Sequence, residues 1–243
     1  MIDFNCYIGN WPFHKLRKNS FEDLKEVHRK NNIKSGYVSS IESIFYNDFY
    51  ESEKELYNTI KGSGYKQVVT VNPTMPACPL VLKRCIEEFE ISGIRIIPSY
   101  HGYSISSEIL NPIIEIAREY KLPVFVTARM MDERLAHMIQ PELQKEEDIQ
   151  EFLSANSDIV FVLCHFKAGE LRGIEEFMSN PNVFSDTSCI RDILIENDDI
   201  KGILRKCVYG SAFPLCPVVS GVMQLETEAC EEIEQIVKNQ SLI

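Results

Sequence analysis

The sequence contains little that would bind it to a membrane or to nucleic acid. Its longest notable apolar run, Ile159–Cys164, is far shorter than the about 20 residues that span a bilayer. The amino-terminal residues show no basic segment followed by an apolar one, so we expect no signal peptide. Basic residues are scarce, with 25 Lys and Arg against 36 Asp and Glu and a formal net charge of −11. Such a charge disfavours nucleic acid and anionic membranes as partners.

Several motifs that would indicate a common chemistry are also missing. The eight cysteines include no C-x-x-C pair, which excludes a zinc ribbon or finger, and they are too sparse for a secreted disulfide scaffold. We therefore predict a cytoplasmic protein with reduced and mostly buried thiols. The chain has no P-loop, no G-x-S-x-G and no H-E-x-x-H, and the short glycine motif Gly62–Gly64 follows a predicted helix, so it is not a dinucleotide fingerprint.

The composition is that of an ordinary globular protein. The 243 residues are 44% hydrophobic and 25% charged, and no linker or repeat divides them, so we expect a single domain over residues 1–243. Short β-rich runs alternate with helical segments, and several runs are continuously apolar, as in parallel strands covered on both faces. The eight predicted strands are Ile2–Ile8, Ser35–Ser40, Gln67–Asn72, Gly93–Pro98, Pro123–Ala128, Ile159–His165, Val183–Asp186 and Cys207–Ser211.

Helical patterns fill the intervals between these strands. Ser20 and Asp23 predict a cap at the start of the first helix. Eight β/α pairs with short connections predict an α/β fold, a (β/α)8 TIM barrel, either regular or distorted, with an open doubly wound sheet as the alternative. The further predicted helices are Glu51–Ile60, Pro79–Phe89, Asn111–Tyr120, Glu146–Leu153, Glu170–Met178, Asp198–Leu204 and Gln224–Val237.

The chemistry of such a barrel lies at the carboxyl ends of its strands. The first strand alternates polar and apolar residues, and period-two geometry places Asp3, Asn5 and Tyr7 on one face. Polar groups inside a barrel mouth line a site or form hydrogen-bonded plugs. Cys6 and Cys164 fall on the faces opposite their polar neighbours, so we expect both between strand and helix.

Five segments at predicted strand ends form a series. They are Asp3–Gly9, Asn72–Pro73, Gly93–Pro98, Leu163–Phe166 and Tyr209–Pro214. In this order they resemble the amidohydrolase superfamily, specifically its amidohydrolase-2 group of TIM-barrel metal-dependent hydrolases. The first segment resembles D-x-H-x-H-x-G, and the last resembles [FY]-G-S-D-x-P. The resemblance covers nearly the whole chain and implies one amidohydrolase-like barrel domain.

The same resemblance implies metal ligands, and most of these are absent. The positions of the family's first-strand histidines hold Asn5 and Tyr7, and the fifth-strand ligand position falls near Thr127. The closing aspartate is replaced by Ala212, which has no lone pair to offer. Only His165 remains at its matching position.

A catalytic zinc normally needs about three protein ligands, and one histidine does not supply them. We therefore expect no metal cofactor. A weakly bound divalent ion such as zinc would have to use His165 together with Asp186 or His101.

A subset of the superfamily resembles this chain more closely. It has Asn5 in place of the first histidine, a Trp-Pro-Phe segment like Asn10–Phe13, a segment like Arg129–Arg134 followed by His137, and one like His101–Tyr103. The resemblance to this subset implies no established reaction. At least one lactonase of the superfamily is described as metal-independent, so loss of the metal need not abolish catalysis.

Three residues are the candidate catalytic groups. His165 follows the sixth strand and is a general acid/base, or a relic satisfied by a neighbouring hydroxyl. His101 follows the fourth strand and is a base or a ligand, or packs against neighbouring tyrosines. Asp186 ends the seventh strand and either orients His165 or caps the next helix. By contrast, we expect His14 and His28 at the surface.

A second group of residues is predicted to bind the substrate. Arg129 and Arg134 would clamp a carboxylate or phosphate, or belong to a salt-bridged loop in which Asp132 holds Arg134. Trp11 would form a lid, a pocket wall or an oligomer contact. The full set of predicted substrate-binding residues is Asn5, Tyr7, Trp11, Tyr103, Thr127, Arg129 and Arg134.

These observations lead to two hypotheses from different classes. The first is a hydrolase, or another cleaving enzyme of lactonase or decarboxylase type, that acts on a small carboxylate-bearing molecule without the family's usual metal centre. The alternative is a catalytically degenerate barrel that binds a small molecule or an assembly partner. The expected partner in both is a small anionic molecule, with a homo-oligomer allowed.

Overall fold

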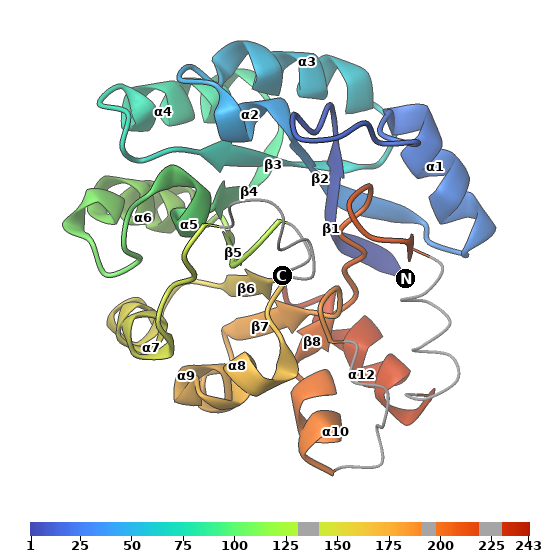
Figure 1. The fold of residues 1–243 in the computed structure, drawn as a ribbon, viewed down its shortest axis with the longest axis vertical. Coiled ribbons are helices and arrows are strands. Elements are labelled where there is room, and N and C mark those ends of the chain that lie inside the picture. Colours follow the sequence, from blue (N-terminus) through green and yellow to red (C-terminus); the bar gives the residue numbers. More distant parts are fainter. Residues whose placement is uncertain (131–140, 191–197, 219–229) are drawn as a thin grey trace.

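Eight parallel strands follow one another in the computed structural model, each paired with the next in the order β1 to β8. The structure describes residues 1–130, 141–190, 198–218 and 230–243. The strands form a ring with the helices outside it (Figure 1). The strands are β1 (Ile2–Ile8), β2 (Ser35–Ser40), β3 (Lys66–Val71), β4 (Ile91–Ile96), β5 (Val124–Thr127), β6 (Phe161–Cys164), β7 (Val183–Asp186) and β8 (Cys207–Val208).

The ring is nearly closed between its first and last strands. The Phe4 amide donates to the Tyr209 carbonyl and the Tyr7 amide to the Phe213 carbonyl, each over 2.8 Å. Cys6 and Phe213 form a further parallel bridge. The fold is therefore a single-domain (β/α)8 TIM barrel, as predicted, and the open doubly wound sheet is wrong.

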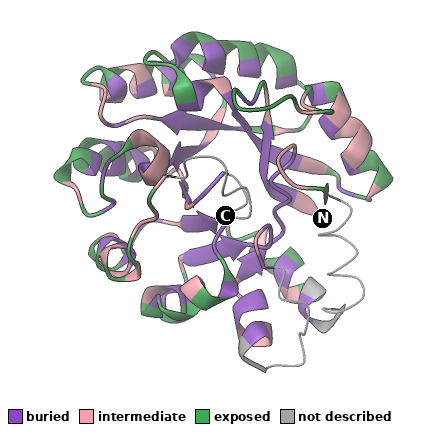
Figure 2. Cartoon of the chain, viewed as in Figure 1, coloured by how far each residue is buried: buried purple, intermediate pink, exposed green. Residues whose placement is uncertain are grey.

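Helices cover the outside of this barrel, and buried residues gather on the strands and on the helix faces turned toward them (Figure 2). The predicted capping box at Ser20 and Asp23 is present. No helix in the described part of the chain is long and apolar enough to cross a bilayer. The helices are α1 (Phe21–Lys30), α2 (Glu42–Phe45), α3 (Tyr50–Ile60), α4 (Cys78–Glu88), α5 (Pro98–His101), η1 (Glu108–Leu110), α6 (Asn111–Tyr120), α7 (Glu146–Ala155), α8 (Ala168–Arg172), α9 (Glu175–Ser179), α10 (Asp198–Leu204) and α12 (Cys230–Asn239).

Two helix predictions differ from the structure. The single helix expected over Glu170–Met178 is wrong, because α8 ends at Arg172 and α9 begins at Glu175. Between them Ile174 takes an extended backbone and buries its side chain completely, which breaks the helical path. The helix expected over Gln224–Val237 falls partly outside the described residues, and α12 begins at Cys230.

The inside of the barrel is filled by an apolar cluster with residues from β1, β2, β3, β5, β6 and β8. This cluster contains Phe4, Tyr37, Val68, Phe125, Val162, Cys164 and Val208, and Ile243 packs against it. The position of Cys164 corrects the prediction that it lies between strand and helix. The prediction assumed that the side chain of His165 points to the opposite face of β6 from that of Cys164. His165 lies beyond the end of β6 and has a φ of 61°, so the direction of its side chain does not determine which face Cys164 occupies.

Strand β1 breaks its own alternation. Asp3 pairs with Gly36 of β2, and Cys6 pairs with Val38. The step from Asp3 to Cys6 in β1 is therefore one residue longer than the matching step in β2, which is a β-bulge. As a result Asp3 faces helix α1, where it bonds to His28. The prediction that Asp3 shares a face with Asn5 and Tyr7 is therefore wrong, because the bulge resets the period.

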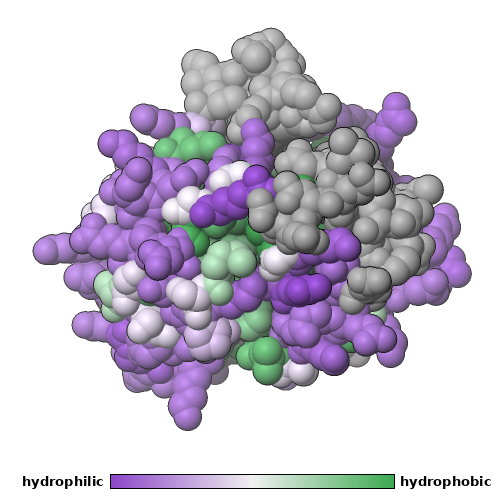
Figure 3. All heavy atoms as spheres, turned by 90° about the horizontal axis from the view of Figure 1, so that it is seen from below, coloured by the Kyte–Doolittle hydropathy of each residue, from purple (hydrophilic) through white to green (hydrophobic). Residues whose placement is uncertain are grey.

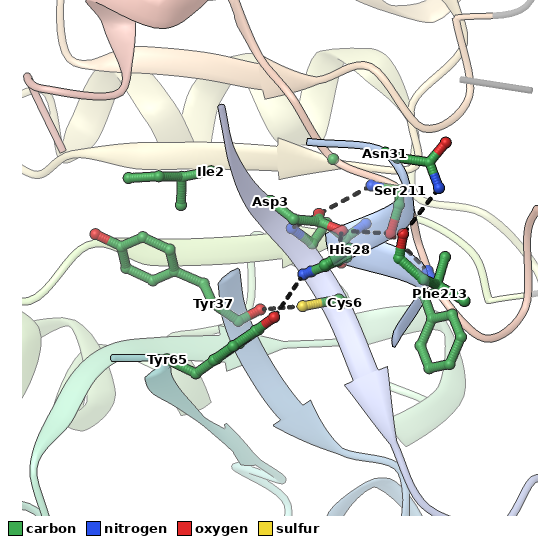
Figure 4. A network of polar contacts seen from close by, with 12 residues as sticks. Ile2, Asp3, Cys6, His28, Asn31, Tyr37, Tyr65, Ser211 and Phe213 are labelled. Carbon is green, nitrogen blue, oxygen red and sulfur yellow. Dashed lines mark hydrogen bonds and ion pairs between the residues drawn. The ribbon is translucent and has the colours of Figure 1, made fainter. Parts of the chain in front are cut away.

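The Asp3 carboxylate ties three elements together (Figure 4). It accepts from His28 Nε2 over 3.0 Å and from the Ser211 amide over 3.0 Å, and His28 Nδ1 lies 3.0 Å from the Tyr65 hydroxyl. His28 is 1% exposed, so the expectation of a surface histidine is wrong. Its hydrogen bonds to β1 and to Tyr65, directly before β3, explain the burial.

The molecular surface is less apolar than the interior. One face is mostly hydrophilic, with a small group of hydrophobic side chains near its middle (Figure 3). A homo-oligomer stays a prediction.

We expect His28→Ala to destabilise the fold by about 2–3 kcal/mol, because a buried carboxylate loses a partner and the ring leaves a gap. Urea unfolding measures this difference. His14→Ala is the matched control, since His14 is exposed, and its effect should stay within about 0.5 kcal/mol. Equal effects of the two substitutions would contradict the role of the Asp3–His28 pair.

A buried carboxyl on α3 makes stability depend on pH. Burial raises the pKa of Glu53 from 4.5 to about 7, although hydrogen bonds from Ser43, Gln67 and Thr70 and the charge of Arg95 oppose the rise. The folded state therefore holds a proton that the unfolded state releases, and its contribution to stability is lost as the pH rises from 4.5 through about 7.

Glu53→Gln should remove this dependence. The free energy of unfolding of the native protein, relative to the variant, should fall by up to about 3 kcal/mol across that pH window, measured by urea unfolding at a series of pH values. Glu55→Gln, on the exposed side of the same helix, should leave the profile unchanged. A constant difference between native protein and Glu53→Gln would refute the assignment.

Candidate active site

A fully buried guanidinium lies at the centre of the candidate site. Arg95 of β4 donates from Nε to Ser39 Oγ over 2.9 Å, and from one terminal nitrogen to Tyr7 Oη over 2.6 Å and Thr127 Oγ1 over 2.7 Å. The guanidinium carbon lies 4.6 Å from the ring centre of Tyr7 and 5.4 Å from that of Phe125. The other terminal nitrogen is buried and makes no geometric hydrogen bond within the described residues, although the Cys164 side chain acts on the guanidinium and raises its pKa. One arginine thus joins strands β1, β2, β4 and β5.

The surroundings keep this arginine charged. Burial lowers the pKa of Arg95, but Tyr7, Cys164 and Asp186 more than offset it, so the pKa lies above its usual value. Burial raises the pKa of the Tyr7 hydroxyl, even though the charge of Arg95 acts in the opposite direction. A neutral phenol therefore accepts from a permanent cation.

Asp186 is the second polar centre of the site. It ends β7, is fully buried, and accepts from Asn5 Nδ2 over 2.5 Å, from the His165 amide over 3.1 Å and from Ser188 Oγ over 2.8 Å. Gly210 permits this approach, because a Cβ there would lie 2.7 Å from the Asp186 Cβ and 3.0 Å from the Asn5 Cβ. The carboxylate thus connects β1 with the end of β6.

His165 is held in an unusual conformation by its neighbours. Its φ of 61° is strained for a residue with a Cβ, and such strain gathers at functional sites. Its amide donates to Asp186 and its carbonyl accepts from Arg129 over 2.7 Å. The ring Nδ1 lies 2.8 Å from the Arg129 carbonyl, which only accepts, so Nδ1 carries the proton. Asp186 therefore positions the backbone of His165 and not its ring.

The other ring nitrogen of His165 faces a cysteine. Nε2 lies 3.8 Å from Sγ of Cys216, which follows β8 and is partly exposed. Burial lowers the pKa of His165, but Cys216, Asp186 and the Arg129 carbonyl together raise it above its ordinary value. The imidazole is therefore a proton acceptor beside a thiol.

Arg129 forms an ion pair with Glu170 of α8, with one nitrogen 3.0 Å from Oε2. Binding of a substrate anion by Arg129 stays a prediction. Asp132, Arg134 and His137 lie outside the described residues.

Two further predicted residues, His101 and Tyr103, lie apart from this centre. His101 on α5 donates from Nε2 to the Ile44 carbonyl over 2.9 Å, and burial lowers its pKa. Its ring stacks on Tyr103. Within the described residues, neither His101 nor Tyr103 contacts His165, so the structure does not pair the two histidines.

Trp11 forms part of an apolar layer that includes Tyr7. Its other members are Ile41, Ile44, Ile97 and Met130. Trp11 is 4% exposed and packs edge-on against Phe13 and Phe45. Trp11 thus shares an apolar cluster with Tyr7, and its role as a lid, a pocket wall or an oligomer contact stays a prediction.

Two cavities adjoin the carboxyl ends of the strands. One of 290 Å³ is lined by Thr127, Arg129, Gln144, Phe166 and Glu170, among others. A larger one of 720 Å³ is lined by none of the predicted site residues. The smaller cavity is therefore the one in contact with the predicted site.

The donor set does not fit the metal centre that the superfamily resemblance implies. Tyr7 and Thr127, at two of the expected ligand positions, both accept from Arg95. Asn5 donates its amide to Asp186, and Ala212 has no donor atom on its side chain. A divalent ion here would face a fixed guanidinium, which opposes its binding electrostatically.

A different group, Asp3, Cys6 and His28, has its potential ligand atoms within 4.8 Å of one another. Their hydrogen bonds are already made, since Cys6 Sγ donates to the Tyr37 carbonyl and Asp3 accepts from His28. An ion would have to displace these bonds. We assign the group to the structural network of Figure 4.

A parallel barrel with polar side chains inside the carboxyl ends of its strands is the architecture of a TIM-barrel enzyme. The chain belongs to the amidohydrolase family, because the family model described as Amidohydrolase matches residues 59–235. A comparison with curated proteins gave no match.

Solved structures with the same fold share little sequence with this chain. A 5-carboxyvanillate decarboxylase from Novosphingobium aromaticivorans, complexed with manganese and 4-hydroxy-3-methoxy-5-nitrobenzoic acid, has a TM-score of 0.67 at 13% identity, over 88% of this chain and 76% of that one. A candidate 2-pyrone-4,6-dicarboxylic acid hydrolase from Pseudomonas putida has a TM-score of 0.67 at 14% identity, over 97% of this chain and 93% of that one. A candidate amidohydrolase from Staphylococcus aureus has a TM-score of 0.70 at 11% identity, over 97% of this chain and 95% of that one.

Sequence reasoning missed two residues of the site. Arg95 is the charged residue inside the apolar run 94–97, and that position was a signal of a buried cation. Cys216 lies just beyond the closing motif, and only the chain path after β8 brings it to His165.

Arg95→Met should lower the free energy of unfolding by at least about 2 kcal/mol, because three buried hydroxyls lose their donor. Arg95→Lys keeps the charge but not the planar fork, so its effect should be intermediate. Urea unfolding gives the values. The control is Arg118→Met, at an exposed ion pair with Asp158, which should change stability by less than about 1 kcal/mol. Native stability of Arg95→Met would contradict the central role of the guanidinium.

Proposed function

We propose that this chain is a hydrolase of small carboxylate-bearing esters, in particular lactones, and that it works without a resident metal ion. The observation that carries the proposal is the bonding of Tyr7 and Thr127 to Arg95. A guanidinium supplies, at this point of the barrel, positive charge of the kind that a metal supplies in other members of the superfamily.

The substrate class is suggested by charge and by the relatives. The buried terminal nitrogen of Arg95 makes no geometric hydrogen bond in the described part of the chain, so it can donate to a carboxylate. The Novosphingobium enzyme holds a carboxylated aromatic ring, and the Pseudomonas protein is named for a pyrone dicarboxylate. We infer a small cyclic carboxylate for this chain.

His165 performs the proton transfers in this proposal. Its Nδ1 proton is fixed on the Arg129 carbonyl, which leaves the Nε2 lone pair to accept a proton from the attacking group. The same nitrogen then returns the proton to the leaving oxygen. Asp186 and the Arg129 guanidinium hold the backbone on either side, so the ring keeps its direction.

The test is turnover of a panel of pyrone and lactone carboxylates, followed by liquid chromatography with mass detection. We expect hydrolysis by the native protein, a loss of about 100-fold or more in His165→Gln, and native rates in His14→Ala. Dialysis against a chelator should leave the rate unchanged. Activity that is lost on dialysis and restored by manganese or zinc would refute the metal-free mechanism.

A second function, binding without turnover, is favoured by one observation. Ala212, whose backbone has a φ of 53°, stands where the family carries its closing aspartate, and its methyl group offers no acid or base for turnover. In this case a carboxylate would raise the melting temperature by mass action but remain uncleaved. Arg95→Met should lose the shift under either function, so a carboxylate that shifts the melting temperature and stays uncleaved is the result that separates a binder from a hydrolase.

A further inference from the structure

We infer that Cys216 is the nucleophile of this site, activated by His165, and that it forms a thioester with the acyl group of the substrate. The inference rests on the proposed hydrolase function and specifies its attacking group. It is carried by the juxtaposition of a partly exposed thiol with a histidine whose tautomer and backbone are both fixed.

The geometry has the three parts that an activated nucleophile needs. The nucleophile atom Sγ lies 3.8 Å from the base atom Nε2. The base is oriented by a third group, since the opposite ring nitrogen donates to the Arg129 carbonyl over 2.8 Å. This is the logic of a cysteine–histidine pair steadied by an acceptor, built here from a backbone carbonyl.

The other described cysteines do not share these features. Five of them are buried: Cys6, Cys78, Cys85, Cys164 and Cys207. Cys189 is partly exposed like Cys216, but its Sγ faces an Arg129 nitrogen at 4.0 Å, and burial raises its pKa to about 11. The combination of exposure with a histidine acceptor sets Cys216 apart.

The reaction balances without an oxidant or other co-reactant. The Cys216 proton passes to His165 Nε2, and Sγ bonds to the carbonyl carbon of the lactone. The carbon–oxygen bond to the ring oxygen breaks, and that oxygen takes the proton from Nε2. Water then adds to the thioester, gives its proton to Nε2, and the carbon–sulfur bond breaks with return of the proton to sulfur.

The test uses p-nitrophenyl acetate, with intact-mass detection and peptide mapping. We expect one acetyl group on Cys216 of the native protein, with acylation about 100-fold slower in His165→Gln. No acetyl should form in Cys216→Ala, and Cys189→Ser, the matched control, should react like the native protein. Acetylation elsewhere, or an equal rate in His165→Gln, would overturn the inference.

A comparison within the native protein covers the case in which His165→Gln fails to fold. In one sample, iodoacetamide should modify Cys216 at least tenfold faster than Cys189, and equal rates would overturn the inference.

The outcomes also separate this inference from the proposed function. If lactones are hydrolysed and Cys216→Ala retains the rate, the hydrolase stands and the nucleophile is wrong. If Cys216 is acetylated as expected but no lactone of the panel is hydrolysed, Cys216 is the nucleophile and the proposed substrate class is wrong.

Discussion

The polar interior of this barrel depends on the charge of one arginine. A guanidinium taken out of water is stable only where its donors are met, and Arg95 meets hydroxyls from three other strands. Each of these hydroxyls is in turn fixed by the arginine. Below this level the barrel is filled by apolar side chains, so the arginine marks the boundary between the packed core and the chemistry.

Asp186 acts on this cation through space, without a direct salt bridge between the two side chains. The carboxylate raises the pKa of the arginine through space while its own oxygens are taken by Asn5, Ser188 and the His165 amide. The two charges therefore organise different halves of the site. Arg95, on β4, holds side chains of β2 and β5, whereas Asp186, on β7, holds the residue that follows β6. Both also bond to a side chain of β1.

Much of the fold was predictable, because fully apolar runs such as 159–164 identify strands covered on both sides. The β-bulge at Asp3 was not, since it depends on pairing with β2 and leaves no local mark. His28 was mistaken for a surface residue for a related reason. Its partners, Asp3 and Tyr65, are distant in sequence, and only the closed barrel places them around one ring.

The candidate site was predicted in part for the same physical reasons. The barrel rule directs attention to the carboxyl halves of the strands and the residues directly after them. The structure places five of the residues predicted there around two charges: Asn5, Tyr7, Thr127, His165 and Asp186. Contacts made by loops, such as that between Cys216 and His165, follow from the chain path beyond the strands. A strand-based argument does not reach them.

The bonds of Arg95 also limit how this barrel can evolve. Replacing Ala212 with an acidic residue would supply one ligand, yet Tyr7 and Thr127 would still be held by the guanidinium. Replacing Arg95 alone would free them but leave buried hydroxyls unpaired. Converting this site into a metal centre would therefore take several coordinated replacements, because no single one both supplies ligands and frees the hydroxyls from Arg95.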